Sequence, residues 1–141
     1  QFVYGAEFGK FYNTERIFFD NFQHFRASDI MVTEKGFRED LLLADSYLYS
    51  TNNEWVKYNA EYRSNYIILN HLPFLNSALY TESLYFKGLW LPDKGVVYNE
   101  AGYSFGIQGT LRAGLFTAFE GKKYIGTGFR LEIPFLSDIY R

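Results

Sequence analysis

Residues 56–68 alternate in character at every second position, and this constrains the fold more than any other feature of the chain. One parity is mainly apolar or aromatic, from Val56 to Ile68. The other parity is entirely hydrophilic and consists of Lys57, Asn59, Glu61, Arg63 and Asn65. A period of two is typical of a β-strand with one apolar and one polar side. A tilted strand crosses the hydrocarbon layer of a bilayer with roughly 9 to 11 residues, so this stretch favours a membrane-spanning β-barrel.

The composition also favours strands. Aromatic residues make up 21% of the 141 residues, with 13 Tyr and 15 Phe, against 3 Pro and 1 Met. Aromatic side chains suit the half-buried surface of a pleated sheet. The length fits one domain, so we expect residues 1–141 to form a single β-barrel domain or the C-terminal part of a larger barrel.

The same alternation recurs three times in the last third of the chain, over residues 100–107, 111–120 and 125–133. Short turns, at 108–110 and 121–123, separate these repeats. Consecutive strands with such short connections predict an antiparallel meander. We also expect a weaker strand at 78–91, a turn at 92–95, a break in pairing at 70–73, and extended chain at 3–11 and 41–50.

The direction of the apolar side is the central question, because a soluble lipid-binding barrel alternates just as regularly with that side inward. In the last two strands the polar side mixes Gly with charges, which is typical of a crowded barrel interior. We therefore predict an all-β, antiparallel up-and-down transmembrane β-barrel. The predicted charged set facing the lumen is Lys57, Glu61, Arg63, Arg112, Glu120, Arg130 and Glu132. The predicted lipid-facing set is Val56, Tyr58, Tyr62, Tyr103, Phe105, Leu115, Phe129 and Leu131. The aromatic residues expected near the bilayer surfaces are Trp55, Tyr58, Trp90, Tyr98 and Tyr124.

Several function classes find no support in the sequence. The chain has 14 basic and 16 acidic residues without a run of like charge, which gives nucleic acid no electrostatic footprint. The absence of Cys excludes disulfides, thiolate metal sites and cysteine nucleophiles. No apolar run reaches the ~18 residues of a membrane helix. We assign no catalytic residue, no cofactor and no metal ligand. An enzyme that modifies lipids through His24 or His71 stays open as an alternative, although both histidines fit structural roles better.

Short motifs in the middle of the chain resemble a known family. They are Phe22-Gln23-His24-Phe25, the stretch 47–52, and Glu61-Tyr62-Arg63 leading into residues 67–75. In order and spacing they resemble the C-terminal barrel region of a Bacteroidota family of large outer-membrane proteins. Those proteins carry a carboxypeptidase-regulatory-like domain followed by a long domain of unknown function. The resemblance implies a terminal piece of a much larger chain, located in the bacterial outer membrane.

The sequence thus predicts an integral outer-membrane β-barrel protein with a structural, assembly or transport-associated role and no catalysis of its own. Its expected partners are outer-membrane lipids and other outer-membrane or periplasmic proteins. The alternatives are the small lipid-modifying enzyme and the soluble lipid-binding barrel.

Overall fold

A computed structural model describes residues 1–12, 18–25, 31–33, 36–45, 47–72, 80–107 and 109–133. The strands are β1 (Phe2–Gly9), β2 (Val32–Thr33), β3 (Trp55–Ser64), β4 (Thr81–Leu91), β5 (Val96–Ile107), β6 (Leu111–Glu120) and β7 (Lys123–Glu132). Two single-turn 3-10 helices, η2 (Phe19–Asn21) and η3 (Leu69–His71), lie between strands. In the described part of the chain, no helix is long and apolar enough to cross a bilayer.

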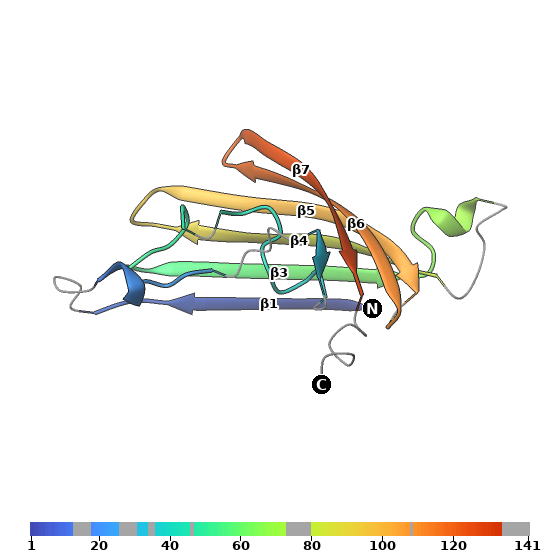
Figure 1. Ribbon diagram of the computed structural model, residues 1–141, viewed down its shortest axis with the longest axis horizontal. Helices are drawn as coiled ribbons and strands as arrows, with labels where there is room; N and C mark the ends of the chain where they lie inside the picture. The colour runs from blue at the N-terminus through green and yellow to red at the C-terminus, as the bar shows by residue number, and fades with distance from the viewer. Residues whose placement is uncertain are drawn as a thin grey trace.

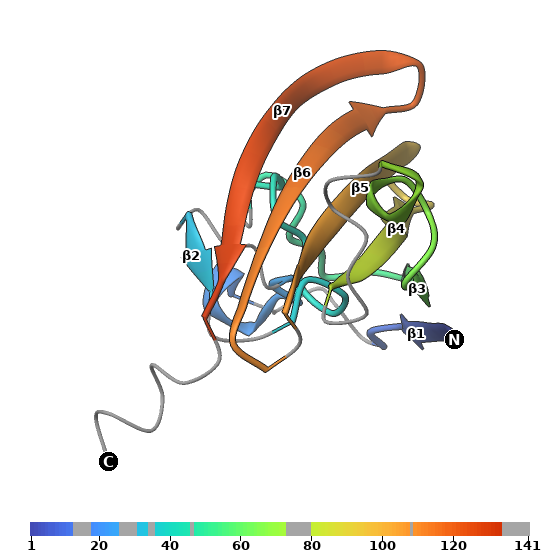
Figure 2. The same cartoon turned by 90° about the vertical axis from the view of Figure 1, so that its right-hand side faces the viewer.

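The seven strands of the described residues belong to one curled sheet in the order β1-β3-β4-β5-β6-β7-β2 (Figures 1 and 2). The predicted meander is present from β3 to β7, where each strand pairs antiparallel with the next. β2 pairs parallel with β7, so the expectation of a purely antiparallel up-and-down sheet is wrong at this edge. The sheet forms a half-barrel whose edge strands are β1 and β2.

The predicted turn at 92–95 is present, and the turn predicted at 121–123 is one residue shorter, because Lys123 already belongs to β7. Of the turn predicted at 108–110, residue 108 lies outside the described residues. Residues 92–95 connect β4 and β5, and the turn between β6 and β7 begins at Gly121. Gly109 and Gly121 have φ angles of 78° and 57°, which residues with a side chain rarely adopt. A change of register between Ala118 and Phe119 leaves Ile125 as the extra residue of a bulge, which bends β7.

Two predicted segments differ from the structure. β3 ends at Ser64 and not at Ile68, because the backbone N–H groups of residues 67–69 bond to the Glu82 carboxylate instead of a neighbouring strand. The expected extended chain at 41–50 is wrong. Within the described residues it consists mainly of bends, turns and irregular chain, because side chains from the sheet take up backbone groups at Leu42 and Leu43.

The sheet curls around residues 36–45 and 47–51, which we call the inner segment (Figure 2). The sheet face that contacts the inner segment is the inner face, and the opposite one is the outer face. Phe37, Leu41, Leu42, Ala44 and Tyr49 of the inner segment are all buried there. They pack against residues of the inner face that include Tyr85, Leu89, Tyr98 and Phe116. The hydrophobic core therefore lies between the inner segment and the sheet.

Candidate functional site

A fully buried ion pair lies at the centre of the inner face. Lys87 of β4 and Glu100 of β5 are register partners, so their side chains emerge side by side on the same face. The Lys87 ammonium lies 3.4 Å from Glu100 Oε2, and the two side chains are 2% and 0% exposed. Burying two charges is unfavourable unless further polar groups complete their hydrogen bonding.

The inner segment supplies those polar groups from its backbone. Lys87 Nζ donates to the carbonyl oxygens of Phe37, at 2.7 Å, and Asp40. Glu100 accepts hydrogen bonds from the backbone N–H groups of Leu42 and Leu43, at 2.9 and 2.7 Å. On the inner segment, these contacts involve only backbone atoms. The sheet therefore fixes the backbone course of this segment through bonds that do not depend on its side chains.

One more polar contact ties the same segment to β7, and another, within β5, completes the bonding of Glu100. Tyr98 donates to Glu100 Oε1 at 2.7 Å, which adds a third donor to that carboxylate. Arg130 of β7 donates to the carbonyl oxygen of Leu42. Side chains of β4, β5 and β7 therefore all bind the backbone of residues 37–43.

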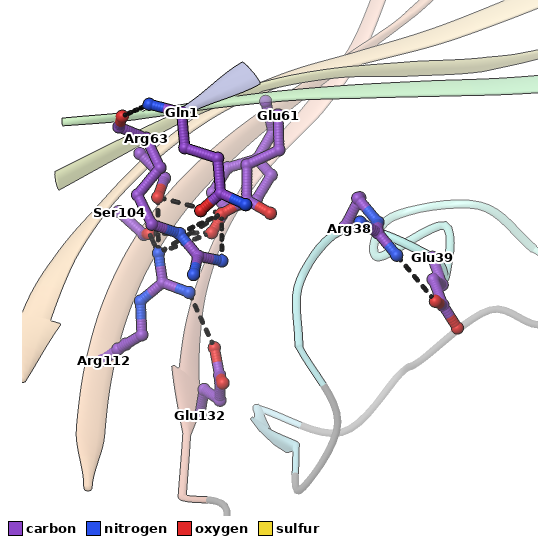
Figure 3. Close-up of polar contacts among 10 residues, drawn as sticks. Gln1, Arg38, Glu39, Glu61, Arg63, Ser104, Arg112 and Glu132 are labelled. Carbon is purple, nitrogen blue, oxygen red and sulfur yellow. Dashed lines mark hydrogen bonds and ion pairs between the residues drawn. The ribbon is translucent and has the colours of Figure 1, made fainter. Parts of the chain in front are cut away.

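A second buried cluster centres on Arg112 of β6 (Figure 3). The two N–H bonds of Arg112 Nη2 are shared among the hydroxyls of Ser83, Tyr85 and Ser104, at 2.7 to 2.9 Å. Its Nη1 lies 3.4 Å from Glu132, the register partner on β7. Arg112 is thus bound from β4, β5 and β7 at once.

The same cluster reaches β3 through Glu61. Ser83 donates to Glu61 Oε1 at 3.0 Å, and Arg63 pairs with the same oxygen at 2.8 Å. Arg112 lies 3.8 Å from it. Two arginines and two glutamates therefore balance in formal charge, and they form a chain of contacts from Arg63 through Glu61 and Arg112 to Glu132.

Aromatic rings fill the space between the two clusters. Phe37 makes edge contacts with Tyr85 and Phe116, with ring centroids 6.1 and 5.2 Å apart. Phe116 in turn fits only because its neighbours on the inner face are glycines. A Cβ at Gly102 would lie 2.1 Å from the Phe116 ring, and one at Gly114 would lie 2.6 Å from it. The inner face is therefore closely packed around the Phe116 ring.

Tyr49 links the far end of the inner segment to β6. Its hydroxyl donates to Glu120 at 2.8 Å, and its ring lies 4.8 Å from that of Tyr98. Burial, and then the hydrogen bond to the negative Glu120, raise the pKa of the Tyr49 hydroxyl well above its usual range. The hydroxyl therefore stays a neutral donor at physiological pH.

Two hollows flank the inner segment. One of about 500 Å³ is lined by charged groups of both walls, including Arg38, Arg63, Arg112 and Glu132. Another of about 290 Å³ lies beside His24, Lys57 and Asp40. Charged side chains make up much of the lining of both hollows, which suits water or small polar solutes. Among the residues that the structure describes, no group of three or more His, Cys, Asp or Glu side chains could hold a metal ion.

The comparisons with known proteins assign the chain to a family. Residues 1–105 match the model of a family described as "Family of unknown function (DUF5686) C-terminal domain". The chain belongs to this family. Neither the curated proteins nor the solved structures contain a match. In this DUF5686 domain, the matched part includes the inner segment together with Lys87 and Glu100, whereas Arg112 and Arg130 follow it.

The domain brings most of the predicted lumen-facing set together. Glu61, Arg112 and Glu132 form one buried cluster with the half-buried Arg63. Arg130 and Glu120 instead bind the inner segment, through Leu42 and Tyr49. Lys57 shares the inner face, where it lines the smaller hollow.

The predicted lipid-facing set lies on the outer face. Tyr62, Phe105, Leu115 and Phe129 are between 42% and 55% exposed. Val56, Tyr58, Tyr103 and Leu131 share this face by register and are half-buried among their neighbours. Trp55 and Tyr98, expected near the bilayer surfaces, face inward, because they lie on the inner parity of β3 and β5; Tyr98 is fully buried.

The sequence did not indicate that Lys87 and Glu100 form the central contact between the sheet and the inner segment. Their positions in the alternating pattern place both on the polar face of adjacent predicted strands. The sequence alone does not pair them, because a Lys and a Glu on neighbouring strands become partners only when the strand register is known. The two histidines occupy separate places. His24 Nδ1 lies 2.7 Å from Ser50 Oγ, while His71 ends η3 and is exposed.

Proposed function

We propose that this domain is part of an integral β-barrel of the bacterial outer membrane, with a structural, assembly or transport-associated role and no catalysis of its own. The observation that carries the proposal is the outer face. Of the outer-face strand residues that the structure describes, Glu82 alone carries a formal charge. Soluble proteins rarely expose an apolar surface of this extent to water.

Polar groups on the outer face bond to one another, which also supports a lipid environment. Tyr58 donates to Asn99, and the hydroxyls of Thr117 and Thr127 lie 3.1 Å apart. Tyr124 donates to Thr127 at 3.0 Å. Without water, a polar group must find its partner within the protein. A soluble lipid carrier would instead turn its apolar side inward, where this domain carries charges.

A lipid environment further requires a partner for β1. It is an edge strand of eight residues, and in the described part of the chain only β3 pairs with it. A bilayer does not tolerate an unpaired backbone edge. The proposal therefore includes additional strands, from a longer chain or from an outer-membrane or periplasmic partner, that pair with β1 and close the barrel.

The family membership is compatible with such a longer chain, because the matching model describes a C-terminal domain. We propose that the complete protein is a Bacteroidota outer-membrane protein with a carboxypeptidase-regulatory-like domain ahead of the barrel. In that protein the inner segment would act as a plug. Any passage of cargo through the barrel would require the contacts of Lys87, Glu100 and Arg130 to be released.

The lipid-modifying enzyme has one observation in its favour, the contact between His24 and Ser50. Ser50, however, is only 1% exposed, so a substrate carbonyl has no access to its hydroxyl in this arrangement. His24 also lies beside the polar hollow and away from the apolar outer face, where a lipid would arrive. Both residues fit better as parts of the contact between residues 23–25 and the inner segment.

The experiment that tests the proposal follows the native protein through membrane flotation and then labels it with a lipid-confined photoreagent. We expect the protein to float with outer-membrane vesicles and Phe105 to be labelled. Phe116, which is fully buried on the inner face of β6, serves as the matched aromatic that stays unlabelled. Recovery in the soluble fraction, or equal labelling of both rings, would overturn the proposal.

A further inference from the structure

The connection from β3 to β4 begins by folding over the outer face. Glu82 of β4 is the register partner of Ser64 and therefore points outward. Its side chain is nevertheless buried, at 1% exposure, because residues 67–69 cover it. The one charged residue among the described strand residues of the outer face is thus hidden by the start of this connection.

The Glu82 carboxylate is fully occupied by donors. It accepts from the backbone N–H groups of Ile67, Ile68 and Leu69, at 3.2, 2.7 and 3.1 Å. It also accepts from the hydroxyl of Tyr103, at 2.6 Å. Successive N–H groups that converge on one carboxylate stabilise its charge without water. The same bonds fix the direction in which the connection leaves the sheet.

Fixed in this way, the connection displays apolar side chains beyond the ends of the strands. Tyr66, Ile68 and Leu72 are 69%, 53% and 46% exposed. Figure 1 shows η3 beyond the ends of β3 and β4. These exposed apolar side chains lie past the strand ends, where a protein surrounded by water would gain from polar residues.

We propose that residues 66–72 form a foot that rests in the interfacial layer of the lipid bilayer, with Glu82 as the positioning residue that holds it there. This rests on the proposed function, because it needs the outer face to contact lipid. The occupant is the lipid surface itself. Aromatic and aliphatic side chains such as Tyr66 and Ile68 suit the boundary between head groups and acyl chains.

The test uses single cysteines, because the chain contains none of its own. Spin labels at Ile68→Cys, Leu84→Cys and Lys94→Cys, in the protein within its native membrane, report depth through their access to oxygen and to a water-soluble nickel complex. Leu84 lies on the outer face of β4, and Lys94 is exposed in the turn after that strand. We expect the label at 84 to be deep, the label at 68 shallow but shielded from nickel, and the label at 94 open to water.

These labels separate the two proposals. A label at 84 that nickel reaches freely contradicts the membrane proposal itself. A deep label at 84 together with a label at 68 as open to water as that at 94 overturns the foot alone.

Substitution of Glu82 tests the positioning role. In Glu82→Gln the side chain loses its charge and one acceptor oxygen, so we expect the label at 68 to become more mobile and at least several-fold more accessible to nickel, with the label at 84 unchanged. Tyr103→Phe removes one bond to the same carboxylate and should produce a smaller change in the same direction. Glu54→Gln, at an exposed carboxylate, is the matched control and should change neither label. Unchanged mobility at 68 in both test variants would contradict the role of Glu82.

Discussion

The inner and outer faces of the sheet differ in which partners their polar side chains bind. On the inner face, charged side chains are buried and meet the backbone of the inner segment, as Lys87 and Glu100 do. On the outer face, apolar side chains such as Leu115 and Phe129 are exposed, while the polar groups pair among themselves. On the sheet of a typical water-soluble protein, exposed positions favour charged residues. In this sheet the charged residues lie buried among the core of the inner face, and the exposed positions of the outer face are largely apolar. The difference teaches that the surroundings of a sheet face are inferred from the groups that its side chains bind, and not from the hydropathy of the sequence alone.

The largest expected effect comes from breaking the central ion pair. Glu100→Leu removes the acceptor for Leu42, Leu43 and Tyr98 and leaves the buried Lys87 without its counter-ion. We expect the free energy of unfolding to fall by about 3–5 kcal/mol, the cost of an uncompensated buried charge. Urea unfolding of the protein in detergent or vesicles measures it. Glu54→Leu, at an exposed carboxylate, is the control, with a change within about 1 kcal/mol.

The double variant Lys87→Met with Glu100→Leu sharpens this result. It removes both charges, so it should recover part of the loss, although the backbone groups of residues 37–43 still lack their partners. A double variant that is less stable than Glu100→Leu alone would show that the pair is not coupled as described.

A charge placed on the outer face tests the other half of the comparison. In a bilayer, Leu115→Arg should lower the free energy of unfolding by about 2–4 kcal/mol, because Arg is unfavourable at mid-depth. Leu111→Arg, on the same face at the end of the same strand, should cost about 0–1 kcal/mol. Unfolding from vesicles measures both. Equal, small effects at the two positions would indicate that water covers this face.

The packing of the inner face predicts a smaller effect. Gly102→Ala places a Cβ against the Phe116 ring and should destabilise the fold by about 1–3 kcal/mol through overpacking. Gly126→Ala is the matched control, because no heavy atom lies within 4 Å of a Cβ there, and its effect should stay within about 0.5 kcal/mol. Thermal or urea unfolding compares the two. A tolerated alanine at 102 would mean that Phe116 is free to move aside.

The smallest effect concerns Tyr49. Tyr49→Phe removes its hydrogen bond to Glu120 and should cost about 0.5–1.5 kcal/mol at neutral pH. Because the pKa of Tyr49 is raised in the folded state, its contribution is complete below about pH 10, where the unfolded chain begins to ionise, and declines above it. The difference in stability between wild type and variant should therefore shrink as the pH rises above 10. A difference that is constant to pH 11 would contradict the linkage.

Much of the meander could be predicted from the sequence. The alternation at 111–120 gave β6 its bounds, Leu111–Glu120, and Gly109 and Gly121 marked the turns around it. These signals are local, since a period of two and a left-handed glycine each depend on a few neighbouring residues. The bends of residues 41–50 had no such signal, because their apolar run fits a buried strand equally well.

The sequence by itself determined which residues share a face and where the chain reverses, because both follow from backbone geometry over two to four residues. Only the tertiary structure decided that Lys87 meets the carbonyl of Phe37, 50 residues away, and that β2 adds to β7 in parallel. It also decided that Glu82 ends β3 by binding the chain that would have continued it. Such partners depend on how distant segments meet in space, and a buried charge or a free backbone group accepts whichever segment the fold brings to it.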